Sequence, residues 1–249
     1  MISVTRQNCG FTLIELMCSM AIGSIILLTA VSVLGSAGDG YTRVSGGMAV
    51  EREARAVIAQ LTSDLSSAMF HKNVVFEKSF VNWSADRIGF LSLQPADAQA
   101  DADRIGDLCA VNYYLKNRTI NGKTVRCLMR GFHDSRQTFA ALGSDAVSSL
   151  FAEQSAIDEP IAFNVVSFEA RPKSRDASGR WVDWMRDDVS GPAALDLHLV
   201  IARRNLAERL IQPGDWDSVK WLGNPSDADR NKDLEIYGAM IRFGNHETH

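Results

Sequence analysis

Charged residues are missing from one long stretch near the start of this 249-residue chain. No Asp, Glu, Lys or Arg lies between Glu15 and Asp39, and the residues up to Leu34 are apolar or small. A helix rises about 1.5 Å per residue, so about 20 such residues cross a hydrocarbon core of about 30 Å. The sequence therefore predicts a membrane-spanning helix. Its one carboxylate, Glu15, must lie near the interface, be protonated or be paired, because a charge inside a bilayer costs at least about 2.5 kcal/mol.

The chain also lacks the patterns that mark common enzymes and nucleic-acid-binding proteins. None of its five histidines stands in an HExxH pattern, its serines lack a nucleophile-elbow context, and no phosphate-binding glycine loop follows a predicted strand. The net charge of −4 gives no basic excess for binding nucleic acid. We therefore expect no catalytic residues, no cofactor and no nucleic-acid partner.

Cysteine is scarce, and two of the four cysteines lie at or before position 18. The other two, Cys109 and Cys127, are candidates for a disulfide in an oxidising compartment. If Asn121-Gly122 forms a two-residue hairpin turn, however, Cys127 lies opposite Lys116. Cys109 is then seven positions away from Lys116 along the other strand. At about 3.3 Å per residue this separation exceeds the reach of a disulfide. The pair can form only if the turn lies elsewhere.

Two ordinary explanations of the apolar stretch fit the sequence less well. A secretory signal peptide has an apolar core of about 7–15 residues behind a basic segment, whereas this run is longer, begins with Glu15 and follows a single basic residue, Arg6. An uncleaved anchor of a periplasmic enzyme or binding protein explains the length but gives Glu15 no role. Both explanations remain as alternatives.

Residues 10–16, GFTLIEL, resemble the cleavage and methylation site of type IV prepilins. The resemblance implies that a prepilin peptidase cuts between Gly10 and Phe11, methylates the new amino group of Phe11, and leaves Glu15 to govern assembly. Phe11 and Glu15 lie four residues apart, so they share one helix face. We expect the Phe11 ammonium of one subunit to neutralise Glu15 of its neighbour and to fix the register of the stack.

The same resemblance implies how the chain is organised and with what it associates. Residues 1–10 would be a leader and 11–38 a transmembrane and assembly helix, crossing the inner membrane lipid once. Residues 39–72 would be a glycine-rich joint and an amphipathic helix, in which Glu51 and Arg55 pair on the solvated face. Residues 73–249 would be a periplasmic β-rich domain. The implied partners are the peptidase, an inner-membrane assembly platform and other pilin or pseudopilin subunits in an envelope fibre.

Most of the sequence after Lys72 predicts strands, because segments rich in β-branched and aromatic residues alternate with turn residues. One long helix followed by antiparallel strands indicates an α+β, pilin-like fold with the helix packed on the sheets. A short helix is expected over 143–154. The predicted strands are 74–81, 87–93, 108–115, 124–130, 161–171, 181–185, 195–204 and 234–243.

Several of these segments also resemble the J-type minor pseudopilins and the related W-type minor pilins. The similar segments are 87–91, 111–114, 128–130, 161–168 and 181–184. The chain is larger than a typical major subunit, which also favours a minor one. The resemblance implies a structural, non-enzymatic subunit of a type II secretion pseudopilus or of a type IV pilus-like fibre.

One polar segment suggests a metal site. Oxygen-bearing side chains alternate along 227–235, a spacing that EF-hand calcium loops use. Such loops have glycine at the sixth position and glutamate at the twelfth, where this chain has Lys232 and Gly238. A hydrated loop is therefore the simpler expectation, and calcium is the alternative. The candidate ligands are Asp227, Asp229, Asn231, Asp233 and Glu235.

Overall fold

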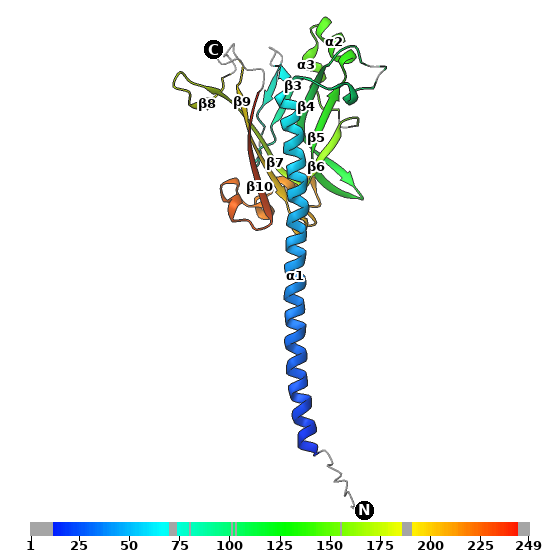
Figure 1. Ribbon diagram of the computed structural model, residues 1–249, viewed down its shortest axis with the longest axis vertical. Helices are drawn as coiled ribbons and strands as arrows, with labels where there is room; N and C mark the ends of the chain where they lie inside the picture. The colour runs from blue at the N-terminus through cyan, green and yellow to red at the C-terminus, as the bar shows by residue number, and fades with distance from the viewer. Residues whose placement is uncertain are drawn as a thin grey trace, which may run out of the picture. The chain divides into compact units, whose positions relative to one another are not determined.

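The computed structural model of the protein describes residues 12–69, 74–79, 81–100, 102, 104–154, 156–185 and 191–243. The chain divides into two compact units, Met1–Met48 and Ala49–His249. Helix α1 (Leu13–Ser66) supplies most of the first unit and continues into the second (Figure 1). The predicted leader, 1–10, and Phe11 lie outside the described residues.

Helix α1 continues through the segment where the sequence predicts a soft joint. Gly35, Gly38 and Gly40 lie inside it, as do Gly46 and Gly47. The helix ends at Ser66, six residues before the end of the predicted segment 39–72. The next residues form strand β1 (Ala68–Met69), which pairs with β3 (Arg87–Leu93).

The second unit contains two antiparallel sheets. The six-stranded sheet has the order β1, β3, β4 (Leu108–Ile120), β5 (Lys123–His133) and β6 (Glu159–Phe163), and β2 (Val75–Glu77) also pairs with β3. The four-stranded sheet has the order β10 (Leu234–Arg242), β9 (Ala194–Ala202), β7 (Val165–Arg175) and β8 (Trp181–Asp183). One long helix with antiparallel sheets confirms the α+β prediction.

The structure divides one predicted strand between the two sheets. The segment predicted over 161–171 is broken at Asn164, whose φ of 57° turns the chain. Strand β6 before it belongs to the six-stranded sheet and β7 after it to the four-stranded sheet. Asn tolerates this left-handed conformation better than a β-branched residue, so a single residue can redirect the chain.

Short helices occupy the connections between strands. In place of the single helix expected over 143–154, the chain forms α2 (Ser135–Gly143) and α3 (Val147–Leu150). The connection between β9 and β10 contains α4 (Arg204–Ala207), η2 (Pro213–Asp217), α5 (Val219–Leu222) and η3 (Pro225–Arg230), and η1 (Ala96–Ala98) follows β3.

The main core of the second unit joins the end of α1 to both sheets. Ala54, Val57, Leu61 and Leu65 recur at helical spacing and are buried. They belong to one cluster with Phe90, Tyr113 and Leu128 of the six-stranded sheet and with Leu195, Leu197, Leu199 and Ile241 of the four-stranded sheet.

The hairpin of β4 and β5 settles the position of the two later cysteines. Asn121 and Gly122 both have positive φ, 50° and 77°, as a tight two-residue turn requires. Cys127 lies opposite Lys116, the register expected from a turn at these residues. Cys109 and Cys127 are free thiols. The suggested disulfide is therefore not formed, because the strand register holds the two cysteines apart.

Candidate functional site

The first turn of α1 is closed by Thr12 and Glu15. The backbone N–H and the hydroxyl of Thr12 donate to Glu15 Oε2 at 3.0 and 2.8 Å, and the backbone N–H of Glu15 donates to Thr12 Oγ1 at 3.3 Å. This reciprocal pattern is a capping box, which satisfies N–H groups that a helix start leaves unpaired. This second role of Glu15 was not predicted from the sequence, although Thr-x-x-Glu before an apolar run is its signal.

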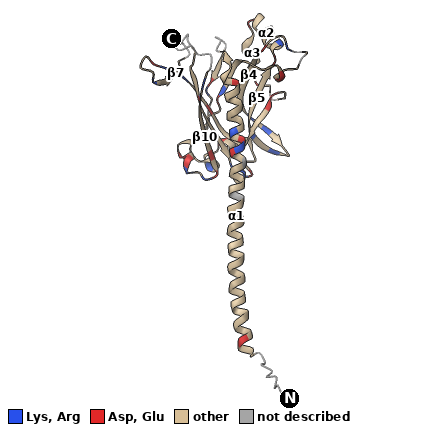
Figure 2. Cartoon of the chain, in the orientation of Figure 1, with Lys and Arg blue, Asp and Glu red and all other residues tan. Residues whose placement is uncertain are grey.

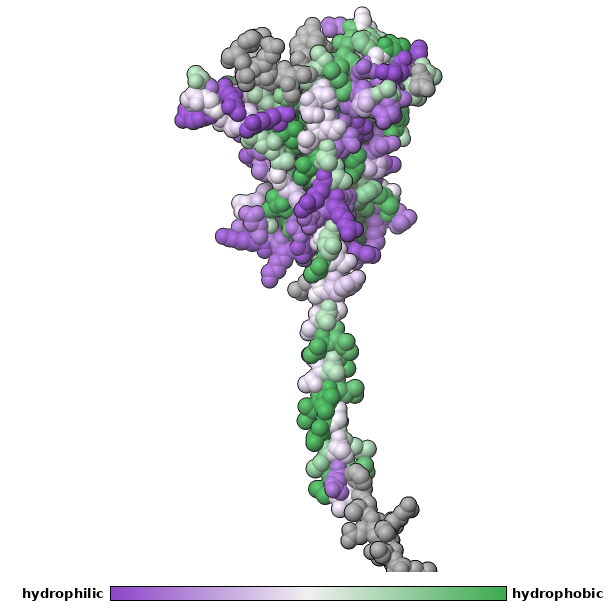
Figure 3. Space-filling view, in the orientation of Figure 1, coloured by the Kyte–Doolittle hydropathy of each residue, from purple (hydrophilic) through white to green (hydrophobic). Residues whose placement is uncertain are grey.

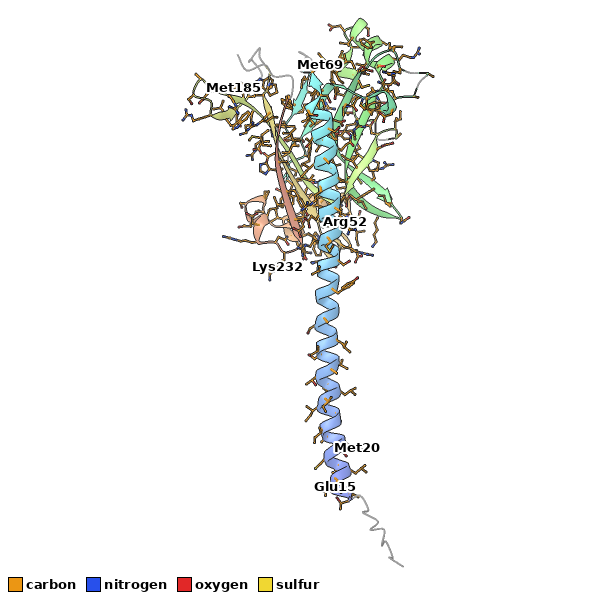
Figure 4. All side chains as sticks on the ribbon, viewed as in Figure 1. Glu15, Met20, Arg52, Met69, Met185 and Lys232 are labelled. Atoms are coloured by element: carbon orange, nitrogen blue, oxygen red, sulfur yellow. The ribbon has the colours of Figure 1, made fainter. Side chains whose placement is uncertain are left out.

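Residues 13–38 present apolar side chains in every direction around the helix. None of these residues is buried, and Figure 3 shows the segment in the colours of high hydropathy. Figure 2 colours one position near its start as acidic, and Figure 4 labels Glu15 there. Such a surface is typical of a helix whose solvent is lipid or other apolar helices.

Four hydroxyl groups along this segment are paired within the helix itself. Ser19 Oγ donates to the carbonyl of Glu15 at 2.8 Å, and Ser24 Oγ donates to that of Met20 at 2.8 Å. Thr29 and Ser36 make the same kind of bond. These bonds satisfy the four hydroxyl donors without water, which suits a hydrocarbon environment.

The segment has the length and composition of a membrane span. Residues Leu13–Gly38 form the one helix, among the described residues, that meets both requirements, with a mean hydropathy of 2.2 over its most apolar window. The predicted cleavage residues, Gly10 and Phe11, precede it and lie outside the described part of the chain. Glu15 is therefore the one predicted processing or assembly residue whose surroundings the structure describes.

Another carboxylate of α1, that of Asp64, is completely buried in the second unit. Arg130 of β5 donates to it through Nε at 2.8 Å and through Nη2 at 3.1 Å, and Gln94 Nε2 donates at 3.0 Å. The hydroxyl of Tyr113 in β4 also donates to Asp64. Burial and the Asp64 charge raise the pKa of Tyr113 well above its usual value, so this hydroxyl stays protonated.

This network attaches the end of α1 to the six-stranded sheet by directional bonds. Asp64 was not among the residues predicted to have a role. It lies three residues after Leu61 and four before Ala68, both on the predicted apolar face. A carboxylate at that spacing is the signal that could have revealed a buried ion pair.

The candidate calcium ligands do not converge. Asp227 pairs with Arg230 at 3.0 Å, Glu235 pairs with Arg203, and Asn231 Oδ1 accepts the backbone N–H of Asp233 at 3.0 Å. Within the part of the chain that the structure describes, no three His, Cys, Asp or Glu side chains are placed to hold a metal ion. The suggested site is not assembled, since Asp227, Asn231 and Glu235 have other partners and no metal-holding group forms. Asp229 contributes to no such group either.

Comparison with known proteins gives one match, which covers the start of the chain. Residues 5–31 match the family model described as the prokaryotic N-terminal methylation motif. Neither curated proteins nor solved structures give a significant match. The match covers the capped start of α1 and most of its apolar segment. The chain thus carries the N-terminal methylation motif that is typical of type IV prepilin-like proteins.

Proposed function

We propose that the protein is a structural, non-enzymatic minor subunit of a type IV pilus-like fibre or of a type II secretion pseudopilus. A prepilin peptidase removes residues 1–10 and methylates Phe11. The chain is first held in the inner membrane by its apolar helix, with the β domain in the periplasm. The assembly platform then moves the helix into the fibre, where it packs against the helices of other subunits.

One observation carries this proposal: an exposed apolar helix whose first turn holds the Glu15 carboxylate in a capping box, and which lies within a matched methylation motif. Transfer from lipid into a bundle of helices exchanges one apolar environment for another. Packing and ion pairing must therefore supply the assembly energy. A methylated Phe11 ammonium of one subunit and Glu15 of the next would form such a pair and set the stagger.

The minor role is supported by the β domain. The segments that resemble the J-type and W-type subunits lie in β3, β4, β5, β6, β7 and β8 of the structure. Such a subunit would use its large domain to contact neighbouring subunits. Those contacts give it a structural task that requires no catalytic residues.

The N-terminus of the mature protein tests the processing step. We expect mass spectrometry of the protein purified from its own membranes to give a terminal peptide that begins with N-methyl-Phe11. An intact Met1 would indicate an ordinary anchor of a periplasmic enzyme or binding protein. A start near Gly38 would indicate a released signal peptide. Either result would overturn the proposal.

Two substitutions of Glu15 separate its charge from its role in the capping box. Glu15→Gln removes the charge but keeps an oxygen that can accept from Thr12, because Gln also serves at this position of the box. Glu15→Val removes both. We expect both variants to enter the membrane and to be poorly incorporated into fibres. Normal incorporation of Glu15→Gln would mean that the residue acts only as a helix cap.

A further inference from the structure

Among the strands that the structure describes, β10 pairs with β9 alone, so it forms an open edge of the four-stranded sheet. The bonds from Arg203 N–H to Asp233 O, 2.8 Å, and from Phe243 N–H to Ala193 O, 3.1 Å, mark the two ends of the ladder between these strands. Antiparallel ladders bond alternate residues, so the odd-numbered residues of β10 bond to β9. The N–H and C=O groups of the even-numbered residues point away from the sheet.

The side chains along this edge are apolar and exposed. Ile236 and Met240 are 38% and 46% exposed, and Gly238 between them is also exposed. Figure 1 shows β10 as one uninterrupted strand. An unprotected apolar edge of nine residues is a template for another strand, and soluble proteins normally block such edges.

The other edges of the described sheets are blocked or very short. Pro160 gives β6 a residue without an N–H, and the N–H of Phe163 donates to Glu53 of α1. Strands β2 and β8 have three residues each, and β1 has two. Among the described strands, β10 is therefore the edge that can accept a full partner strand.

Two unpaired cations lie at one end of this edge. The guanidinium groups of Arg242 and Arg175 stack on the ring of Trp181, with their Cζ atoms 5.7 and 4.6 Å from its centroid. Neither arginine has an ion pair among the described residues, while neighbouring Lys173 is paired with Asp183. Arginine and tryptophan side chains that remain exposed together are frequent centres of protein interfaces.

The charges indicate what kind of strand fits. A second copy of β10 would present Leu234, Ile236, Gly238, Met240 and Arg242 on the same face, because these residues alternate with the inward-facing ones. Antiparallel pairing would bring apolar residues to Arg242, and parallel in-register pairing would bring another Arg242. Neither arrangement supplies a carboxylate.

We propose that β10 binds an extended strand of a different subunit of the same fibre, by antiparallel or parallel addition to the sheet edge. The incoming strand places alternate apolar side chains beside Ile236 and Met240 and a carboxylate beside Arg242. The inference rests on the proposed function, because that function supplies the neighbouring subunit.

The test uses the full-length protein in cells that make the fibre. A photo-crosslinking amino acid, p-benzoylphenylalanine, replaces Met240, and the same amino acid at exposed Ala140 of α2 serves as the control position. Each version is combined with Gly238→Pro or Gly238→Ala. Proline removes an outward N–H, whereas the Cβ of alanine would lie 3.8 Å from His198 and the carbonyl of Leu197, an ordinary contact distance.

We expect position 240, and not position 140, to give an adduct with one different subunit. The adduct should persist with Gly238→Ala and fall several-fold with Gly238→Pro. Arg242→Glu reverses the charge of an exposed side chain and should lower the adduct as well. Arg242→Lys keeps the charge and should keep the adduct. The arginine variants keep the test valid if the proline variant does not fold.

Three results would overturn the inference: no adduct at position 240 in a processed and incorporated chain, equal adducts with Gly238→Pro and Gly238→Ala in folded proteins, or an adduct with a second copy. Detection of methyl-Phe11 in the same samples distinguishes these failures from failure of the proposed function. Its absence would overturn both proposals.

Discussion

Two carboxylates of α1 are held in different ways. Glu15 is exposed, and among the described residues its carboxylate accepts hydrogen bonds from Thr12 alone, so its charge remains available to another molecule. Asp64 is buried, and Arg130 and Tyr113 are among its donors. A buried charge is tolerated only when its partners are complete. The first carboxylate is therefore suited to assembly and the second to holding the fold.

Removing Asp64 should strongly destabilise the second unit. Asp64→Ala leaves Arg130 and the hydroxyl of Tyr113 without their acceptor, and breaking a buried pair in this way costs about 3–5 kcal/mol. The matched control is Glu51→Ala, whose partner Arg55 is exposed, with an expected cost of about 0–1 kcal/mol. Urea unfolding followed by tryptophan fluorescence measures both. Similar losses in the two variants would contradict the role of the buried network.

The two buried cysteines should react only when the protein unfolds. Burial raises the pKa of the Cys109 and Cys127 thiols to about 11, so neither carries a reactive thiolate near neutral pH. Their contribution to stability is complete below pH 9, the value for unfolded thiols, and is lost as the pH rises toward 11. Mass spectrometry after iodoacetamide treatment at pH 8 should show both residues unlabelled until denaturant is added. Rapid labelling of the native protein would contradict this burial.

At the scale of single elements, the turn of the β4–β5 hairpin fixes the register of the largest sheet. Asn121 and Gly122 set the pairing that puts Lys116 opposite Cys127. A shift of one residue would exchange the two faces of the strands. Tyr113 and Leu128 would then leave the core.

The substitution Gly122→Ala should therefore destabilise the protein, because a residue with a Cβ is strained at the φ of 77° that Gly122 adopts. We expect a loss of at least about 1 kcal/mol. Gly143→Ala is the control, since this residue ends α2 with an ordinary φ and open space for a Cβ. It should be neutral or slightly stabilising. Equal unfolding midpoints for the two variants would contradict the assignment of the turn.

At the scale of the whole molecule, the described residues of the first unit add no apolar residue to the buried core, which lies in the second unit. The apolar residues of 13–38 are exposed, and the main core cluster begins with Val50. The first unit can gain stability only from lipid or from other subunits. This division agrees with a protein that assembles through one part and folds through the other.

A shortened chain tests this division. Residues 49–249 should keep the melting temperature of the full protein in detergent within about 4 °C, since a change of about 1 kcal/mol shifts a domain of this size by about 2–4 °C. Thermal unfolding followed by near-ultraviolet circular dichroism measures the transition. A much larger decrease would show that the first unit contributes to the core.

The sequence alone determined the features that depend on local order. Composition and periodicity, which act between near neighbours, predicted the uncharged run, the Glu15 motif, the amphipathic end of α1 and the limits of β3. Turn chemistry predicted the turn at Asn121-Gly122. The strand predicted over 161–171 was one segment in sequence, because nothing local to Asn164 indicated a change of sheet.

Only the tertiary structure decided which distant residues meet. It brought Asp64 to Arg130, placed β6 and β7 in different sheets, kept the oxygen side chains of 227–235 from converging, and left β10 as an open edge. These outcomes depend on strand order and on the register between segments far apart in the chain. Local pattern does not encode them, because the same alternation of apolar and polar residues is compatible with many orders of strands.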